Sequence, residues 1–114
     1  MVKAENITAG RMVAVNVFVA AGIFARIKGL IGRKSLPQGD ALLLDPCNGI
    51  HTFGMRFPID VLFLDRNNVV VAIRKNLVPN RITPLFFAAK STLELPAGIV
   101  EATATKAGDE IEIA

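Results

Sequence analysis

The pattern of apolar and polar positions along the chain is mainly that of short β-strands joined by turns. Residues 12–18 alternate β-branched side chains with others, which indicates a strand. Residues 59–65 form the clearest strand, and because both of its faces are apolar we expect it to lie inside a sheet. The turn 66–68 contains two Asn, which tolerate positive φ, and it leads into a partner strand at 69–73. Three further strands are predicted at 41–44, 91–95 and 110–113.

A helix is predicted from about Ala20 to Arg33. At about 100° per residue, six side chains form one apolar arc that we expect to dock on the sheet: Ala20, Ile23, Phe24, Ile27, Leu30 and Ile31. The opposite side carries the small residues Gly22, Ala25, Gly29 and Gly32. Glycine inside a helix costs about 1 kcal/mol relative to alanine, so either another element approaches this side closely or the helix is poorly formed. A second, short helix is predicted from Pro96 to about Thr105.

These elements together predict an α+β fold that is β-rich, with one longer and one short helix. Five or six strands are expected to form a mainly antiparallel sheet or a partly closed barrel. The chain has no internal repeat, low-complexity tract or linker, so residues 1–114 are expected to form a single domain. With 52% hydrophobic residues, a chain of this length can bury a core without a metal or a disulfide.

Charge and cysteine content narrow the class of function. The 13 basic and 10 acidic residues are spread along the chain, without the clustered cations and interleaved aromatics of a nucleic-acid binder, so nucleic acid is not expected as a partner. Cys47 is the only cysteine, which excludes an internal disulfide and favours a cytoplasmic location. The apolar run from Met12 to Ala25 is too short to span a bilayer. It has features of a signal peptide, but Glu5 precedes it and it continues into an amphipathic pattern, so a folded segment is favoured.

Three separated motifs, in a fixed order, resemble those of a known family. They are Arg26-x-x-Gly29-Leu30-Ile31-x-Arg33-x-x-Leu36-Pro37, the segment Ile59–Asp65, and Leu93-Glu94-Leu95-Pro96-Ala97-Gly98 with Ala107-Gly108-Asp109. Over about residues 12–113 the chain resembles domain of unknown function family 192, also called uncharacterised protein family 0127. The resemblance implies a compact, β-rich fold and brings no established activity.

The chain departs from the family pattern in the segment before Asp60. Typical members carry Phe-Trp-Met-Lys-Asn-Thr where this chain has residues 50–55, so the Lys and Asn of the family are replaced by Phe53 and Gly54. A function that needed those two polar groups is therefore in doubt here. Asp60 carries over residue for residue.

Asp60 is the first candidate for chemistry. It shares a strand face with Leu62 and Leu64, so its carboxylate is expected on a largely apolar surface, where a charge needs a partner. Candidate partners are Arg26, Arg33, Arg56 and backbone amides of residues 50–58. Asp60 can fasten this loop or the helix to the sheet, or it can act in catalysis or ligand binding, and both interpretations stay open.

His51 and Cys47 are the other candidates for chemistry. His51 is the sole histidine and can serve as an acid or base near physiological pH, but a packed or exposed loop imidazole is the alternative. Cys47 is interpreted as a buried structural thiol rather than a nucleophile. Neither a metal site nor a cofactor is expected, because one His, one Cys and the nearby Asp residues lack the spacing of zinc or calcium loops.

The expected binding site is a small polar cleft between the helix and the loop that precedes Asp60. Five residues are predicted to bind a ligand there: Arg26, Arg33, Thr52, Arg56 and Asp60. Cationic walls of this kind suit a carboxylate, a phosphate or a sugar. We therefore expect a non-enzymatic binding or accessory module for a small polar or anionic ligand. The alternatives are a hydrolase-type enzyme that uses Asp60 and His51, and a protein-interaction domain that uses a sheet edge or the glycine-rich helix side.

Overall fold

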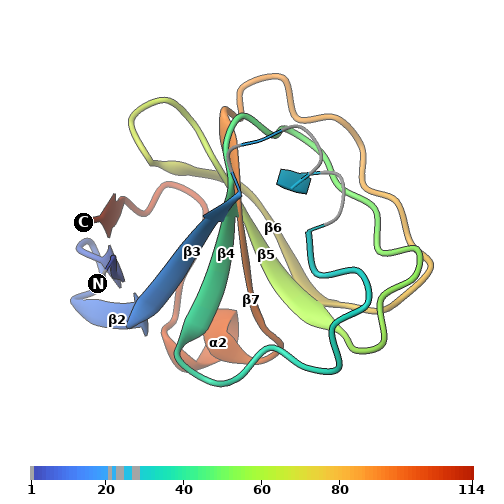
Figure 1. The fold of residues 1–114 in the computed structure, drawn as a ribbon. Helices are drawn as coiled ribbons and strands as arrows, with labels where there is room; N and C mark the ends of the chain where they lie inside the picture. Colours follow the sequence, from blue (N-terminus) through green and yellow to red (C-terminus); the bar gives the residue numbers. More distant parts are fainter. Residues whose placement is uncertain (1, 21, 23–24, 27–28) are drawn as a thin grey trace.

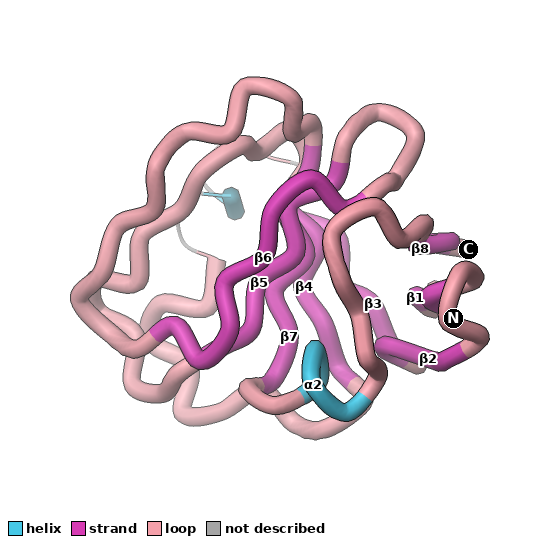
Figure 2. Tube along the Cα trace, turned by 180° about the vertical axis from the view of Figure 1, so that it is seen from behind, coloured by secondary structure: helices cyan, strands magenta, loops and turns pink. Residues whose placement is uncertain are grey.

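The computed structural model describes residues 2–20, 22, 25–26 and 29–114, and its strands form two sheets (Figures 1 and 2). A three-stranded sheet has the order β2-β1-β8, and a five-stranded sheet has the order β3-β4-β7-β5-β6. One short helix, α2 (Ile99–Ala102), lies beside the larger sheet. The strands are β1 (Ala4–Asn6), β2 (Arg11–Ala14), β3 (Asn16–Ala20), β4 (Asp40–Leu44), β5 (Ile59–Leu64), β6 (Val70–Leu77), β7 (Ser91–Pro96) and β8 (Ile111–Ile113).

The larger sheet is antiparallel except at one edge. β3 and β4 run parallel, with Asn16 opposite Asp40 and Ala20 opposite Leu44, while β4, β7, β5 and β6 pair antiparallel. A parallel pair needs a crossover connection of a dozen residues or more, and residues 21–39 provide it. The prediction of a mainly antiparallel, β-rich fold is confirmed. The barrel alternative is wrong, because β3 and β6 stay at opposite edges of the sheet.

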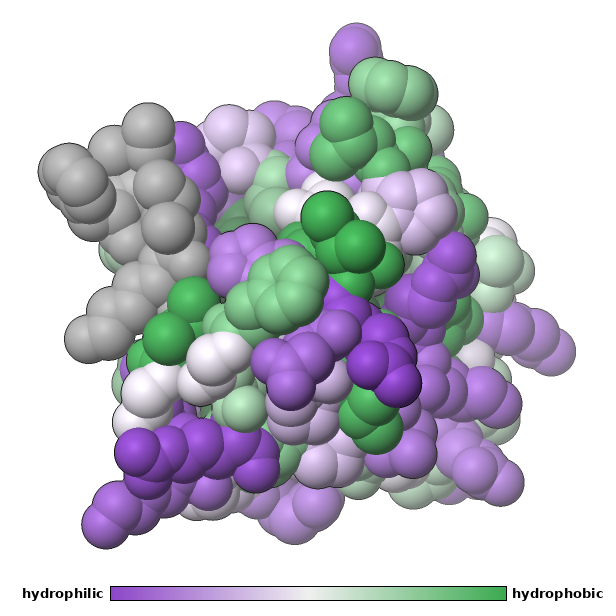
Figure 3. Space-filling view, turned by 90° about the vertical axis from the view of Figure 1, so that its right-hand side faces the viewer, coloured by the Kyte–Doolittle hydropathy of each residue, from purple (hydrophilic) through white to green (hydrophobic). Residues whose placement is uncertain are grey.

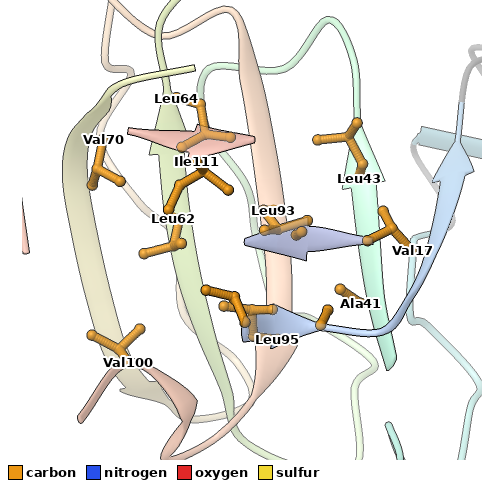
Figure 4. Close-up of a cluster of buried hydrophobic side chains, with 13 residues drawn as sticks. Val17, Ala41, Leu43, Leu62, Leu64, Val70, Leu93, Leu95, Val100 and Ile111 are labelled. Carbon is orange, nitrogen blue, oxygen red and sulfur yellow. The ribbon is translucent and has the colours of Figure 1, made fainter. Parts of the chain in front are cut away.

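The larger sheet is covered on both faces. On one face the first core lies between the two sheets and includes Leu62, Leu64, Leu93 and Leu95 (Figure 4). On the other face the second core forms under the long connections and includes Ile59, Val61 and Phe63 of β5. Every residue of β5 and of β7 is therefore buried, which confirms that residues 59–64 form an interior strand.

The predicted strand over residues 12–18 is two strands in the structure. β2 ends at Ala14 and β3 begins at Asn16, and the two belong to different sheets. Val15, between them, donates its backbone N–H to the Gly39 carbonyl, so the chain changes sheets there without leaving this backbone group unpaired. A continuous alternation of apolar residues does not show where a chain passes from one sheet to another.

The predicted helix from Ala20 to Arg33 is wrong at both ends. Ala20 belongs to β3, and Gly29 and Gly32 have φ of +48° and +83°, which no α-helix contains. Ala25 and Arg26 are helical, while Ile23, Phe24 and Ile27 of the predicted arc lie outside the described residues. In the described ranges one short helix, α2, is complete, and of the predicted longer helix Ala25 and Arg26 are the helical residues. Within those ranges no helix has the length and apolar character needed to cross a membrane.

Asn6 in β1 joins the N-terminal strand to the C-terminal turn. Its side chain is fully buried, and Nδ2 donates to Thr105 Oγ1 at 3.1 Å and to Asp109 Oδ2 at 2.9 Å. The Asn6 hydrogen bond lowers the pKa of Asp109 below its usual 3.8, more than desolvation raises it. The side chain of Asn6 thus ties β1 to the turn that precedes β8, in addition to the backbone pairing between these two strands.

We expect Asn6→Ala to lower the free energy of unfolding by about 2 kcal/mol, because it leaves buried polar groups without their donor. Urea unfolding at pH 7 measures this loss. Asn67→Ala, in the exposed hairpin turn, is the control and should change stability by less than about 0.5 kcal/mol. Equal losses in the two variants would contradict the role given to Asn6.

Candidate functional site

Glu94 is a buried carboxylate in the middle of β7. Its cross-strand neighbours are Leu42 in β4 and Val61 in β5, and both belong to the second core. Only 3% of Glu94 is exposed, and its Oε1 has no hydrogen-bond partner among the residues that the structure describes. Burial raises the pKa of the carboxyl group from its usual 4.5 to about 7. A buried carboxyl group without a partner lowers the stability of the fold, and a pKa near 7 suits a group that exchanges protons at physiological pH.

Glu94 lies in the wall of a cavity of about 330 Å³. The cavity is formed by Arg26 and residues 29–31 of the crossover, by the loop 46–51 that follows β4, and by β7. Its lining is more apolar than polar, with Leu30, Ile31, Leu44, Ile50 and Met55 around the carboxyl group. A largely apolar cavity of a few hundred Å³ with a few polar groups is typical of small-molecule sites.

Gly29 keeps open the space beside the Glu94 carboxyl group. A Cβ at this position would lie 3.6 Å from Glu94 Oε1 and 3.8 Å from the backbone oxygen of Arg26. The residue also has a φ of +48°, which side chains other than glycine rarely adopt. Gly29, from the glycine-rich side of the predicted helix, therefore lies in a turn that borders the cavity.

The loop wall of the cavity is held in place although it has no regular secondary structure. The Thr92 hydroxyl donates to the Cys47 carbonyl at 3.0 Å, and the Cys47 thiol donates to the Gly49 carbonyl at 3.2 Å. Ile50 and Thr83 exchange backbone and hydroxyl hydrogen bonds. The face that carries these loops shows hydrophobic side chains among hydrophilic ones (Figure 3), and the loops expose Phe53, Ile82, Leu85 and Phe87.

The structure brings two of the predicted site residues together and separates the others. Arg26 and His51 both line the cavity around Glu94. Arg33 lines a different hollow beside Phe18 and Val19 of β3, and Arg56 is exposed. Thr52 is fully buried, where its hydroxyl donates to the Val78 carbonyl at 2.7 Å and accepts from the Arg81 amide at 2.9 Å. Thr52 therefore fastens two loops to each other.

Asp60 fastens β5 to α2 and β6. It is 1% exposed, and its Oδ1 accepts from the Asn76 amide at 2.8 Å. Its Oδ2 accepts from the amides of Gly98 at 3.0 Å and Val100 at 2.9 Å. Gly98 is the N-cap of α2 and has no side chain to cap the helix, so the carboxylate of Asp60 supplies the acceptor. Backbone amides do satisfy Asp60 as expected, but they come from these three residues and not from loop 50–58.

Sequence reasoning missed Glu94 because alternation places every second residue of a strand on a solvated face. Leu93 and Leu95 point into the first core, and alternation alone would place Glu94 on an outward face, but the second core covers that face as well. One signal in the sequence could have pointed to Glu94. It is an acidic residue inside a strand that pairs with residues 59–64, and the apolar residues on both faces of 59–64 indicate that both faces of the sheet are covered. Such a residue has no solvated side to occupy. The described residues contain no cluster of three or more His, Cys, Asp or Glu side chains.

The fold and the cavity define a two-sheet, β-rich domain with a pocket of small-molecule size. Residues 4–113 match the family DUF192, described as an uncharacterized ACR, and the chain belongs to this family. It is 33% identical over 112 residues to a UPF0127 protein of Pyrococcus furiosus, covering 94% of each chain. It is also 31% identical over 111 residues to a UPF0127 protein of Thermococcus sibiricus, covering 94% of this chain and 71% of that protein. The family resemblance predicted from the three motifs is confirmed.

Two solved structures share the fold at lower sequence identity. One is a protein of unknown function from Novosphingobium aromaticivorans, with a TM-score of 0.83 and 24% identity, covering 97% of this chain and 82% of that one. The other, from Sinorhizobium meliloti, is described as a putative transcription regulator and has a TM-score of 0.84 and 24% identity. The match covers 98% of this chain and 91% of that one. At this level of identity the likeness concerns the fold alone.

Proposed function

We propose that this domain is a binding module for a small polar ligand, which occupies the cavity around Glu94. The observation that carries the proposal is the buried Oε1 of Glu94, which has no partner among the described residues and borders the cavity. Buried polar atoms are almost always hydrogen-bonded, and an exception calls for an explanation such as an absent ligand. A ligand that donates a hydrogen bond to this oxygen removes the cost of burying it.

The remaining lining supports binding more than catalysis. His51 borders the same cavity and can hydrogen-bond with a polar group elsewhere on the ligand, in keeping with the polar ligand expected from the sequence. The hydrolase alternative needs Asp60 to exchange a proton with His51. Both oxygens of Asp60 accept hydrogen bonds from backbone amides. Protonation of this carboxylate during catalysis would weaken those hydrogen bonds, which counts against the hydrolase alternative.

A thermal-shift screen of a metabolite library against the protein and its Glu94→Gln variant tests the proposal. We expect at least one compound to stabilise the protein, by about 2.7 kcal/mol at a concentration one hundred times its Kd. The variant keeps the shape of the side chain but replaces the unpartnered acceptor with an amide, so the same compound should stabilise it far less.

Glu101→Gln is the matched control, because Glu101 is an exposed glutamate on α2 that lines a different hollow. The control should respond to the compound as the unmodified protein does. If a compound stabilises Glu94→Gln as strongly as the unmodified protein, its binding does not involve Glu94, and if every compound behaves so, the proposal fails.

A further inference from the structure

The inner end of the cavity presents hydrogen-bond acceptors. Glu94 Oε1 and the backbone oxygen of Arg26 both lie within 4 Å of the position that a Gly29 side chain would take. One of these atoms belongs to a carboxyl group and the other to a peptide group, and neither can donate when the carboxyl group is ionised. A ligand group placed beside them must therefore bring N–H or O–H donors.

Charged and titratable side chains approach Glu94 from three elements. The crossover segment brings Arg26, and the loop after β4 brings Cys47 and His51. β6 brings Arg74, because the cross-strand row Leu42, Glu94, Val61 and Arg74 points to one face of the sheet.

Arg74 is engaged away from Glu94. Its guanidinium lies 5.1 Å from the ring centroid of Phe86, and its Nη1 donates to the Ile73 carbonyl at 2.9 Å. Its backbone is two strands from Glu94, which is about 10 Å at the usual strand spacing. Arg74 is therefore not the partner of Glu94, and Oε1 of Glu94, which has no hydrogen-bond partner among the described residues, can accept a cation from outside the chain.

We propose that the ligand is a primary ammonium compound with a small apolar body, whose nitrogen binds Glu94 Oε1. This inference rests on the proposed function and specifies the ligand class for the same cavity. An ammonium group carries three donors and a charge opposite to that of the carboxylate, so it can donate to the unpartnered Oε1 beside Gly29 and form an ion pair with Glu94. The apolar body contacts the aliphatic lining, which includes Leu44, Ile50 and Met55.

Other ligand classes fit this end of the cavity less well. A carboxylate or phosphate placed beside Glu94 meets a like charge in a buried site. An alcohol supplies one donor and no charge. A sugar usually stacks on large aromatic rings, and the lining that the structure describes has His51 as its aromatic side chain.

Binding of an ammonium group is coupled to release of a proton from Glu94. Around pH 7 the carboxyl group is about half protonated, and only the ionised form makes the ion pair. The apparent Kd is the intrinsic Kd divided by the ionised fraction, so it should fall about tenfold between pH 6 and pH 8. A primary alkylamine keeps its own proton over this range, as lysine does.

Three probes with the same four-carbon body separate the ligand classes: butylammonium, butan-1-ol and butyrate. Their binding is measured by NMR titration of the backbone amides of Gly29 and Gly49 at pH 6 and pH 8. We expect butylammonium to bind most tightly of the three, and about tenfold more tightly at pH 8 than at pH 6. Glu94→Gln should lose both this binding and its pH dependence, and the Glu101→Gln control should keep both.

His51→Asn is a second control, because an imidazole can titrate in the same pH range. The pH dependence should persist in this variant, and its loss would overturn the assignment to Glu94. Tighter binding of butan-1-ol or butyrate than of butylammonium would overturn the ammonium inference. If the tighter binding of butan-1-ol or butyrate disappears in Glu94→Gln, Glu94 still binds a ligand, and the proposed function stands without the ammonium inference. If none of the three probes perturbs these amides, the inference fails, and the metabolite screen decides separately on the proposed function.

Discussion

Asp60→Ala should lower the free energy of unfolding by about 3 kcal/mol or more. The carboxylate of Asp60 accepts hydrogen bonds from three backbone amides that connect β5 with β6 and with the start of α2. Hydrogen bonds to a charged acceptor contribute about 1.5–3 kcal/mol each, and each buried amide left without a partner adds a cost. Urea unfolding at pH 7 is the measurement.

Two further variants make the result on Asp60 specific. Asp60→Asn keeps one acceptor oxygen but turns an amide N–H₂ toward a backbone donor. Its free energy of unfolding should therefore fall, but by less than that of the alanine variant. Glu101→Ala removes an exposed carboxylate from the same helix and should cost less than about 1 kcal/mol. Losses of similar size for Asp60→Ala and Glu101→Ala would show that Asp60 does not fasten the helix.

Glu94→Gln should make the domain more stable than the unmodified protein in alkaline solution, and the difference should shrink in acid. The pKa of Glu94 is about 7 in the folded state and near 4.5 in the unfolded chain. Between these values the folded protein holds a proton that the unfolded chain releases, so the free energy of unfolding falls as the pH rises. The loss is complete above about pH 7 and amounts to about 3 kcal/mol, at about 1.4 kcal/mol per unit of pKa shift.

The measurement is the free energy of unfolding of both proteins in urea at pH 4.5 and at pH 8. Glutamine does not titrate, so the difference between variant and unmodified protein should grow by about 3 kcal/mol from the lower to the higher pH. Using the difference removes the contributions of other groups, including Asp109, whose lowered pKa acts in the opposite direction. Parallel pH profiles for the two proteins would mean that Glu94 titrates normally in the folded state.

The carboxylates of Asp60 and Glu94 are buried in neighbouring strands, but we expect them to change the free energy of unfolding in opposite directions. Asp60 is satisfied by backbone amides and is expected to stabilise the domain, whereas Glu94 has an unpartnered oxygen among the described residues and is expected to destabilise it above neutral pH. A residue that costs stability and borders a cavity is typical of a site kept for function. The comparison of Asp60 and Glu94 variants therefore tests whether Asp60 has a structural role and whether Glu94 has the role proposed for it in ligand binding.

Much of the sheet could be predicted from the sequence, because its interior strands are marked by runs of apolar residues between turns. Residues 41–44, 59–64 and 91–95 all lie in strands, and the hairpin at Asn68 has the positive φ of 59° that Asn tolerates. The helix predicted in the crossover was given wrong ends, since Ala20 belongs to a strand and Gly29 and Gly32 have positive φ, although Ala25 and Arg26 are helical. The short strand β1 was missed because Ala4–Asn6 carries neither β-branched nor aromatic residues.

The site could be predicted only in part. Arg26 and His51 lie in the cavity because the crossover and the loop after β4 meet there, as the sequence hypothesis required. Arg33 lies beyond Gly32, whose φ of +83° redirects the chain, so helical spacing from Arg26 did not apply. Glu94 could not be assigned from periodicity, because its environment depends on a second core built from residues distant in sequence.

The parallel pairing of β3 with β4 has a consequence for how binding preference can change in this family. The crossover that this pairing demands supplies Arg26, Gly29, Leu30 and Ile31 to the cavity, whereas Glu94 belongs to the sheet itself. Insertions or substitutions within residues 21–39 can therefore reshape the ligand's surroundings while strand register and the buried acid stay as they are. Under the proposed function, replacing this segment with that of another family member would change the ligand selectivity of this domain while Glu94 stays in place.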